Sequence, residues 1–331
     1  MIFLESRFVD LTVQVRQHFS FIISVGFVFL LTQKAFGEKK IGTLQDLDQN
    51  TSMSYGDALV YGLVEGVTEF LPISSTGHLV LAKEVLAPGA VDERAEALNA
   101  YLIVIQAGAI FAVTLIYRKQ VWSILLGFFG LDPRGRRLGT NLLIAFLPAA
   151  MLGPFLDDLI ESYLLYPRPI ACALFSGAIL MYWVERKRKK ENSFGMSDSG
   201  KSLDDLTARS SLLVGFLQCF AMWPGTSRSM MTIVGGYLVG LKRAKAAEFS
   251  FLLGLITLTA AAAYKSMTKW EVMQANLEIG PVLFGCLIAG ASAATSVVWL
   301  VGYLARRGLG IFVWYRILLA AIILGFYFWQ P

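Results

Sequence analysis

Charged residues are scarce in this 331-residue chain, at 16% of the sequence, while hydrophobic residues make up 56%. This balance excludes an ordinary water-soluble domain and indicates a membrane protein. Six apolar stretches have roughly the 17–25 residues that a bilayer-spanning helix requires. They cover residues 99–117, 138–156, 169–184, 249–264, 281–304 and 312–329. The sequence therefore predicts an all-α polytopic membrane protein with six transmembrane helices.

Cysteine is also rare, and its placement excludes two kinds of site. Cys172, Cys219 and Cys286 lie far apart within apolar stretches and form no CxxC or CxxxH pattern. Neither a metal site nor a disulfide framework is indicated, so we interpret these cysteines as packing residues. The formal net charge of +5 does not indicate a nucleic-acid partner, because the placement of the charges is more informative than their total.

The basic residues are distributed unevenly between the predicted loops. Most of them lie in four segments, at 118–137, 186–209, 242–245 and 306–307. The other loops between the six spans hold only Lys83, Arg94, Arg168, Lys265 and Lys269. Because cytoplasmic loops of membrane proteins carry an excess of lysine and arginine, the four basic segments are predicted to be cytoplasmic. The predicted spans alternate in agreement with this assignment.

Residues 1–50 form an N-terminal extension with two interpretations. Residues 19–31 are mostly apolar and follow Arg16, but they are short for a span. Ala35 and Gly37 are small residues of the kind found at signal-peptide cleavage sites. A cleaved signal peptide and a retained anchor helix both remain open, and both would deliver residue 50 to the outer face.

Two further segments are apolar but are interrupted in the middle. Residues 55–81 are broken by Leu-Pro-Ile-Ser-Ser-Thr-Gly at 71–77, and residues 211–240 are broken by Trp-Pro-Gly-Thr-Ser-Arg-Ser at 223–229. Proline and small polar residues free backbone groups that hydrocarbon cannot satisfy, so each break must lie inside protein or face a water-filled cavity. We predict that each segment is a re-entrant helix pair.

The two broken segments also define an internal repeat. Each is followed by three predicted spans, and the charge distribution makes the first pair enter from outside and the second from the cytoplasm. The predicted membrane domain, 53–331, thus consists of repeat one at about 55–184, a cytoplasmic linker at about 185–209 and repeat two at about 210–329. Inverted-topology repeats place broken helices near the membrane midplane, where their N-termini can face an anion.

The first broken segment carries two carboxylates before its break. Glu65 and Glu69 are four residues apart, so both lie on one face of a helix. Like charges in a low-dielectric site need a metal cation, a basic side chain or a shared proton. Arg228 is the candidate counter-charge. Ionisable residues at membrane depth cost about 2.5–3.5 kcal/mol each and indicate function; the alternative is a structural brace between the repeats.

The second broken segment has the pattern of a helix start that binds phosphate. In Pro-Gly-Thr-Ser-Arg-Ser at 224–229, proline suits the first turn and hydroxyls cap free amides. Amides and the positive dipole end favour an anion, and a guanidinium can bind two phosphate oxygens. A proline kink with ordinary capping is the alternative. The predicted phosphate-binding residues here are Ser227, Arg228, Ser229 and Thr232.

The first break offers hydroxyls and a histidine. His78 is the only histidine outside the N-terminal extension, and imidazole titrates near neutral pH, which suits general acid or base catalysis. A helix cap or an interfacial residue is the alternative role. Ser75 is a candidate nucleophile with Glu69 and His78 nearby as bases, or else a phosphate ligand. Ser74 and Thr76 are predicted to bind phosphate as well.

The segments EGVTEFLPISSTGH, from Glu65 to His78, and WPGTSRSMMT, from Trp223 to Thr232, resemble the two signature motifs of the bacitracin-resistance type of undecaprenyl-diphosphate phosphatase. Similarity extends through AAEFSFLLG after the second motif and through Trp314-Tyr315-Arg316, so that it covers roughly residue 53 to the C-terminus. The N-terminal extension lies outside the resemblance.

This resemblance implies an enzyme that hydrolyses undecaprenyl diphosphate to undecaprenyl phosphate and inorganic phosphate at the outer face of the bacterial inner membrane. The reaction recycles the lipid carrier of peptidoglycan synthesis and confers bacitracin resistance. The resemblance also implies a divalent cation, Mg²⁺ or Ca²⁺, at the acidic pair, and it is compatible with a homodimer. The implied catalytic and binding residues are Glu65, Glu69, Ser75, His78, Ser227, Arg228 and Thr232.

A lipid-phosphate transporter or flippase is the main competing function, because inverted repeats with broken helices are a transporter architecture. Paired glutamates, serines, a histidine and an arginine exceed what anion binding alone requires. The sequence therefore favours hydrolysis over transport.

Overall fold

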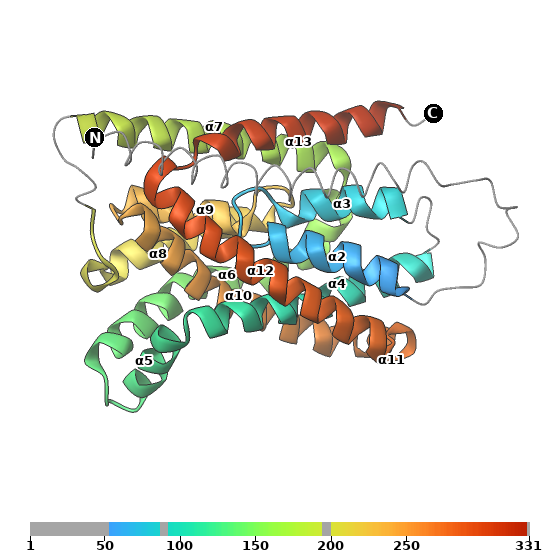
Figure 1. Cartoon of the computed structure of the whole chain (residues 1–331), viewed down its shortest axis with the longest axis horizontal. Helices are drawn as coiled ribbons and strands as arrows, with labels where there is room; N and C mark the ends of the chain where they lie inside the picture. Colours follow the sequence, from blue (N-terminus) through green and yellow to red (C-terminus); the bar gives the residue numbers. More distant parts are fainter. Residues whose placement is uncertain (1–52, 87–91, 194–199, 330–331) are drawn as a thin grey trace, which may run out of the picture.

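The computed structural model describes residues 53–86, 92–193 and 200–329, and the N-terminal extension with its two interpretations lies outside them (Figure 1). Within these residues the chain is built of helices and contains no extended strand. The predicted all-α fold class is confirmed.

Six helices are long and apolar enough to cross a membrane, and each overlaps one of the predicted spans along nearly its whole length. Their exposed surfaces carry large apolar side chains, such as Phe155 at 86% and Leu287 at 71% exposure, which suits contact with lipid rather than water. The six helices are α4 (Asp92–Ile116), α6 (Pro133–Tyr163), α7 (Pro167–Ser193), α10 (Arg243–Thr268), α12 (Ile279–Arg307) and α13 (Gly310–Trp329).

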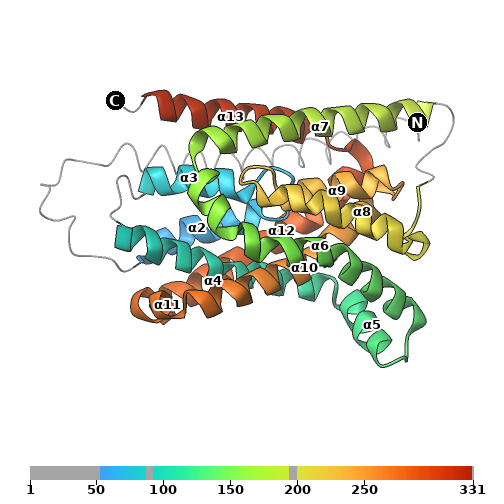
Figure 2. The same cartoon turned by 180° about the vertical axis from the view of Figure 1, so that it is seen from behind.

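Both interrupted segments are helix pairs with their breaks where the sequence places them. The first consists of α2 (Tyr55–Thr68) and α3 (Ser75–Leu86), and the second of α8 (Ala208–Cys219) and α9 (Arg228–Leu238) with the 3₁₀ turn η2 (Phe220–Met222) between them. The helices of each pair contact one another and lie side by side in Figures 1 and 2. Their re-entrant insertion into a bilayer remains a prediction.

The residues immediately before α3 and α9 share an unusual backbone conformation. Ser74 has φ 74° and Ser227 has φ 73°, and they are the only non-glycine residues with positive φ in the described part of the chain. Each hydroxyl accepts a hydrogen bond from a backbone amide of the helix that follows, Gly77 N at 3.3 Å and Met230 N at 3.3 Å. The two breaks are therefore built in the same way, as the predicted internal repeat requires.

Packing between the helices also follows the repeat. Helix α2 packs on α12 of the second repeat, and α8 packs on α6 of the first. Likewise α4 contacts α12 while α10 contacts α6, and α7 and α13 pair with each other along one edge of the molecule (Figures 1 and 2). Each contact that a helix of the first repeat makes with the second repeat has a counterpart in which the roles of the repeats are reversed. Two repeats related by a pseudo-twofold axis produce this arrangement.

Small residues permit the closest of these contacts. A Cβ atom on Gly66 of α2 would lie 2.2 Å from the carbonyl oxygen of Ala289 on α12. Its counterpart on Gly215 of α8 would lie 2.4 Å from the carbonyl oxygen of Ala145 on α6. Any side chain at either position would separate the helices, so glycine sets how deeply each pair is embedded.

The start of the predicted linker differs from a simple solvated loop. Helix α7 continues through the basic run and ends at Ser193. Glu185 is buried, where it pairs with Arg243 at 2.7 Å and accepts the amide of Leu309 at 3.2 Å. Arg188 donates to the carbonyl oxygen of Leu241 at 2.7 Å. Partners from distant segments therefore keep this stretch helical, which a local composition of charged residues does not reveal.

Candidate active site

The two breaks meet and enclose a polar cavity of about 270 Å³. Side chains from α2, the first break, α4 and the second break line it, so both repeats contribute to one site. This is where the sequence predicts a site, between the broken helices. The polar lining residues are Glu65, Glu69, Ser74, Ser75, Thr76, Gln106, Ser227 and Arg228.

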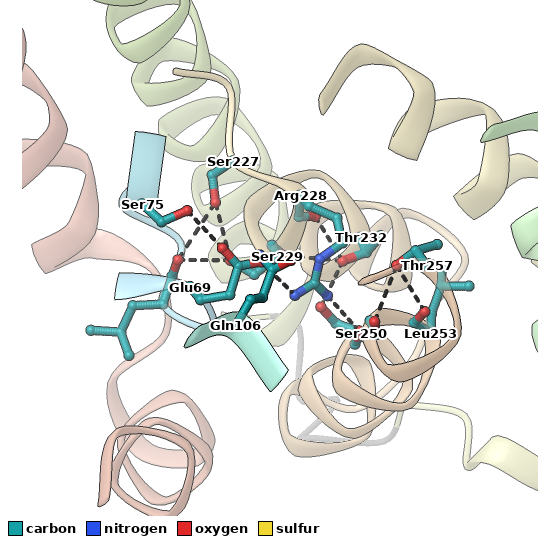
Figure 3. Close-up of polar contacts among 12 residues, drawn as sticks. Glu69, Ser75, Gln106, Ser227, Arg228, Ser229, Thr232, Ser250, Leu253 and Thr257 are labelled. Carbon is teal, nitrogen blue, oxygen red and sulfur yellow. Dashed lines mark hydrogen bonds and ion pairs between the residues drawn. The ribbon is translucent and has the colours of Figure 1, made fainter. Parts of the chain in front are cut away.

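Glu65 and Glu69 lie at the end of α2, with 2% and 8% of their surface exposed. Glu65 accepts a hydrogen bond from Gln106 of α4 at 3.1 Å. Glu69 accepts one from the hydroxyl of Ser75 at 2.6 Å, and its other oxygen pairs with Arg228 at 3.2 Å (Figure 3). Each carboxyl group is thus bound to a donor from another segment, and the guanidinium of Arg228 stabilises the negative charge of Glu69.

Arg228 is the first residue of α9, and its guanidinium is held from several sides. One terminal nitrogen donates to the carbonyl oxygen of Ser250 at 3.0 Å, and the other faces Glu69 (Figure 3). The guanidinium carbon lies 5.4 Å from the centre of the Phe70 ring, within the range of a cation–π contact. Its Nε is buried and has no partner among the described residues. Contacts with α10 and with the first broken segment therefore fix the position of the guanidinium.

The absence of a side chain at Gly254 leaves space for the guanidinium of Arg228. A Cβ atom on Gly254 of α10 would lie 2.2 Å from Nη1 of Arg228. We expect Gly254→Ala to lower the rate of substrate turnover by on the order of 10²-fold, because the guanidinium is the mobile partner and must move from its position in the cavity. The melting temperature should change little, since no backbone has to shift.

Gly302→Ala is the matched control, because that helical glycine on α12 has no atom within 4 Å of the site of a Cβ. Turnover and melting temperature measured for both variants in detergent test the interpretation. Parental turnover in Gly254→Ala would show that the position of the Arg228 guanidinium is unimportant.

The hydroxyls of the first break all line the cavity. Ser75 donates to Glu69, an arrangement that would activate a nucleophile with a neighbouring base. The same hydroxyl also lies where a phosphate ligand would be needed, so both of its predicted roles remain open. Ser74 and Thr76 lie beside it in the lining.

His78 lies behind the cavity and does not line it. Its Nδ1 is 2.7 Å from the carbonyl oxygen of Ser74, which can only accept, so Nδ1 donates. Its Nε2 is 2.6 Å from the hydroxyl of Tyr315, and the two rings stack with centres 5.6 Å apart. These contacts join the first break to α13. A role in proton transfer remains a prediction for this residue.

The phosphate-binding residues predicted in the second break divide into two groups. Ser227 and Arg228 line the cavity. Ser229 is buried and donates to the carbonyl oxygen of Leu71 at 2.7 Å. Thr232 is buried too, with its hydroxyl 2.9 Å from the carbonyl oxygen of Arg228 and 2.6 Å from the Ser250 hydroxyl. The hydroxyls of Ser229 and Thr232 thus bond to neighbouring protein groups and hold α9 in place, and neither residue lines the cavity.

Arg316 on α13 is a residue to which the sequence analysis assigned no role. It is fully buried and donates to four carbonyl oxygens, which join both breaks to α7. The signal for it was available, because an arginine in the middle of an apolar span indicates function. Gln106, in the span of α4, carries a weaker signal of the same kind. The four acceptors are Pro72 at 3.5 Å, Ala173 at 3.1 Å, Leu174 at 3.2 Å and Gly225 at 3.0 Å.

The fold and the cavity define a class: a polytopic α-helical membrane protein whose polar cavity is assembled from two broken helix pairs. Comparison with known sequences identifies the family within this class. The family model of "Bacitracin resistance protein BacA" matches residues 58–322, and the chain belongs to this family. The family resemblance drawn from the two motifs is confirmed.

Curated relatives match most of the chain. It is 40% identical over 267 residues to "Undecaprenyl-diphosphatase 2" of Rhodospirillum rubrum, a match that covers 81% of this chain and 93% of the relative. It is 41% identical over 273 residues to "Undecaprenyl-diphosphatase" of Sorangium cellulosum, with 82% and 86% covered. For the protein of that name from Pseudomonas fluorescens the identity is 41% over 267 residues, with 81% and 92% covered.

Proposed function

We propose that this protein hydrolyses undecaprenyl diphosphate to undecaprenyl phosphate and inorganic phosphate, and so recycles the lipid carrier of cell-wall synthesis. Family membership and the names of the relatives support this activity. The buried carboxylates, hydroxyls and arginine of the cavity supply the acid–base and phosphate-binding groups that a phosphatase needs.

One observation supports a lipid diphosphate as the substrate and not a small phosphate ester. An apolar cavity of about 410 Å³ between α6, α8 and α10 adjoins the polar cavity. Ala221, Arg228 and Leu258 line both cavities. An amphipathic substrate can therefore place its diphosphate at Arg228 while its isoprenoid chain extends into the apolar cavity. A free phosphate ester would use only one of the two.

The geometry supports a short reaction sequence. Arg228, together with the amides at the start of α9, binds the terminal phosphate. Either the Ser75 hydroxyl or a water molecule in its place attacks the terminal phosphorus, and Glu69 accepts the proton. The bond from this phosphorus to the bridging oxygen breaks, and undecaprenyl phosphate leaves with that oxygen. If Ser75 attacks, water then releases the phosphate from the serine.

We also propose a divalent cation, Mg²⁺ or Ca²⁺, at the acidic pair. In the described part of the chain, no three His, Cys, Asp or Glu side chains form a group that holds a metal unaided. Glu65 and Glu69 nevertheless offer the hard oxygen ligands these ions prefer, and Mg²⁺ is commonly held by one or two carboxylates plus substrate phosphates. When bound, the cation would neutralise charge on the diphosphate.

Phosphate release from undecaprenyl diphosphate by the purified protein tests the reaction, and a chelator arm tests the cation. We expect release that chelation abolishes and that added Mg²⁺ or Ca²⁺ restores. The competing transporter function predicts no release in detergent but movement of the lipid between the leaflets of a vesicle. Phosphate release that chelation does not change would support the phosphatase activity and contradict the proposed cation.

The active site is proposed to open to the outer face of the inner membrane, with the basic loops in the cytoplasm. Lys201, an exposed residue after α7, and Trp270, an exposed residue of α11 (Trp270–Asn276), are placed on opposite sides by this topology. In a cysteine-free background, Lys201→Cys should resist an impermeant thiol reagent applied to intact cells, and Trp270→Cys should react. The reverse pattern would overturn the topology. The homodimer stays a prediction from the family resemblance.

A further inference from the structure

A third cavity shares no lining residue with the polar cavity or with the apolar cavity beside it. Its volume is about 440 Å³, and it lies between the loop that joins α5 (Arg118–Phe128) to α6 and the first residue of α8. We refer to it as the α5–α6 cavity. Its polar lining residues are Asp132, Arg136, Arg137, Thr140 and Asn141.

Basic side chains outnumber acidic ones in the lining of this cavity, and most of their donors have no partner in the described part of the chain. Arg136 is exposed, and its guanidinium makes no hydrogen bond or ion pair within the described part of the chain. Arg137 gives one nitrogen to the carbonyl oxygen of Leu206 at 3.3 Å and keeps its other donors. The lining contains one acidic group, Asp132, which accepts the amides of Arg134 and Gly135 at 2.9 and 3.1 Å and the Ser123 hydroxyl at 2.6 Å, so two guanidinium groups face one carboxylate.

An apolar surface adjoins the positive charge. Along α5 and the loop after it, Trp122, Leu125 and Phe129 are spaced as one helix face, and they are 63%, 45% and 79% exposed. Leu131, next to the cavity lining, is 72% exposed. Helices with one apolar aromatic face and nearby basic residues lie in the membrane interface. The α5–α6 cavity is therefore at the depth of lipid headgroups, beside a surface suited to acyl chains.

We propose that the α5–α6 cavity binds the phosphate headgroup of an anionic phospholipid of the cytoplasmic leaflet, with the acyl chains along the exposed face of α5. Arg136 and Arg137 provide charge complementarity to the phosphate, and Thr140 offers a hydroxyl. Basic cavities between helices on the cytoplasmic side are suited to anionic lipid headgroups. The site is independent of the proposed phosphatase reaction, because it shares no lining residue with the polar cavity.

Native mass spectrometry of the full-length protein tests this with phosphatidylglycerol and phosphatidylcholine of identical acyl chains. We expect the first bound lipid to be phosphatidylglycerol in preference to phosphatidylcholine. Arg136→Gln should lower the retention of phosphatidylglycerol by about five-fold, the effect of one basic residue near anionic lipid. Arg306→Gln is the matched control, since Arg306 is also exposed, at the basic end of α12, but lines no described cavity.

A second variant distinguishes lipid binding in the cavity from diffuse attraction to a charged surface. Thr140→Phe would place an apolar ring in the α5–α6 cavity while every arginine is kept, and it should abolish the preference for phosphatidylglycerol. Equal losses in Arg136→Gln and Arg306→Gln would show diffuse attraction and overturn the proposal. An unchanged preference in Thr140→Phe would also overturn it. So would displacement of the lipid by millimolar inorganic phosphate, which would show a site for the free anion.

Discussion

Arg228→Lys is expected to lose nearly as much lipid-diphosphate hydrolysis as Arg228→Ala, a fall on the order of 10²–10³-fold, which is the cost of removing one preorganised donor from a charged transition state. The reason is geometric. The guanidinium bonds to Ser250 and Glu69 in two directions, and Arg228 lines the cavity in which the substrate is proposed to bind. A lysine ammonium is a point charge on a flexible stem and cannot reproduce this planar fork.

Hydrolysis and the melting temperature in detergent, measured for both variants, separate phosphate binding from charge neutralisation. A stable but inactive lysine variant supports phosphate binding. If Arg228 only neutralised Glu69 and Glu65, lysine would retain much of the activity, whereas alanine would leave buried carboxylates uncompensated and unfold more easily. An active lysine variant together with an unstable alanine variant would contradict the proposed role of Arg228 in phosphate binding.

Glu65→Gln and Glu69→Gln are each expected to reduce turnover by on the order of 10²–10⁴-fold, the usual contribution of a general acid or base. The amide keeps the shape of the side chain but cannot accept a proton, and it is a poorer ligand for a cation. At position 69 it also removes the carboxylate that faces Ser75 and Arg228. Stability should change little, because both side chains line a cavity that can admit water.

Phosphate release at saturating lipid and the melting temperature check this prediction for both variants. Glu271→Gln on α11 provides the control, since that residue is exposed and does not line the cavity. If both active-site variants turned over at the parental rate, the carboxylates would be a structural brace between the repeats.

The sequence was sufficient for the features that are local along the chain. Six spans follow from the length of the apolar stretches, and both breaks follow from proline and small polar residues. The meeting of Glu69 with Arg228 was also predictable, because membrane-embedded charges of opposite sign need each other.

The direction of each side chain was not predictable in the same way, because it depends on contacts far apart in sequence. His78 turns to Tyr315 on the last helix. Ser229 and Thr232 look equivalent to Ser227 in the motif, yet they bond to the first break and to α10. A hydroxyl pattern at a helix start indicates capping and anion binding equally well, and only the packed neighbours decide between them.

The exchanged packing of the two repeats has a consequence for the order of synthesis. Glu65 and Glu69 are translated early, but Arg228, which pairs with Glu69, is translated later, and Arg316, which joins both breaks, belongs to the last helix. At the membrane depth predicted for the first helix pair, unpaired carboxylates cost about 2.5–3.5 kcal/mol each. The first helix pair is therefore expected to wait, near the translocon or in the interface, until the second repeat arrives. Catalytic competence would then appear only when α13 has been inserted, so an unfinished chain cannot hydrolyse its lipid.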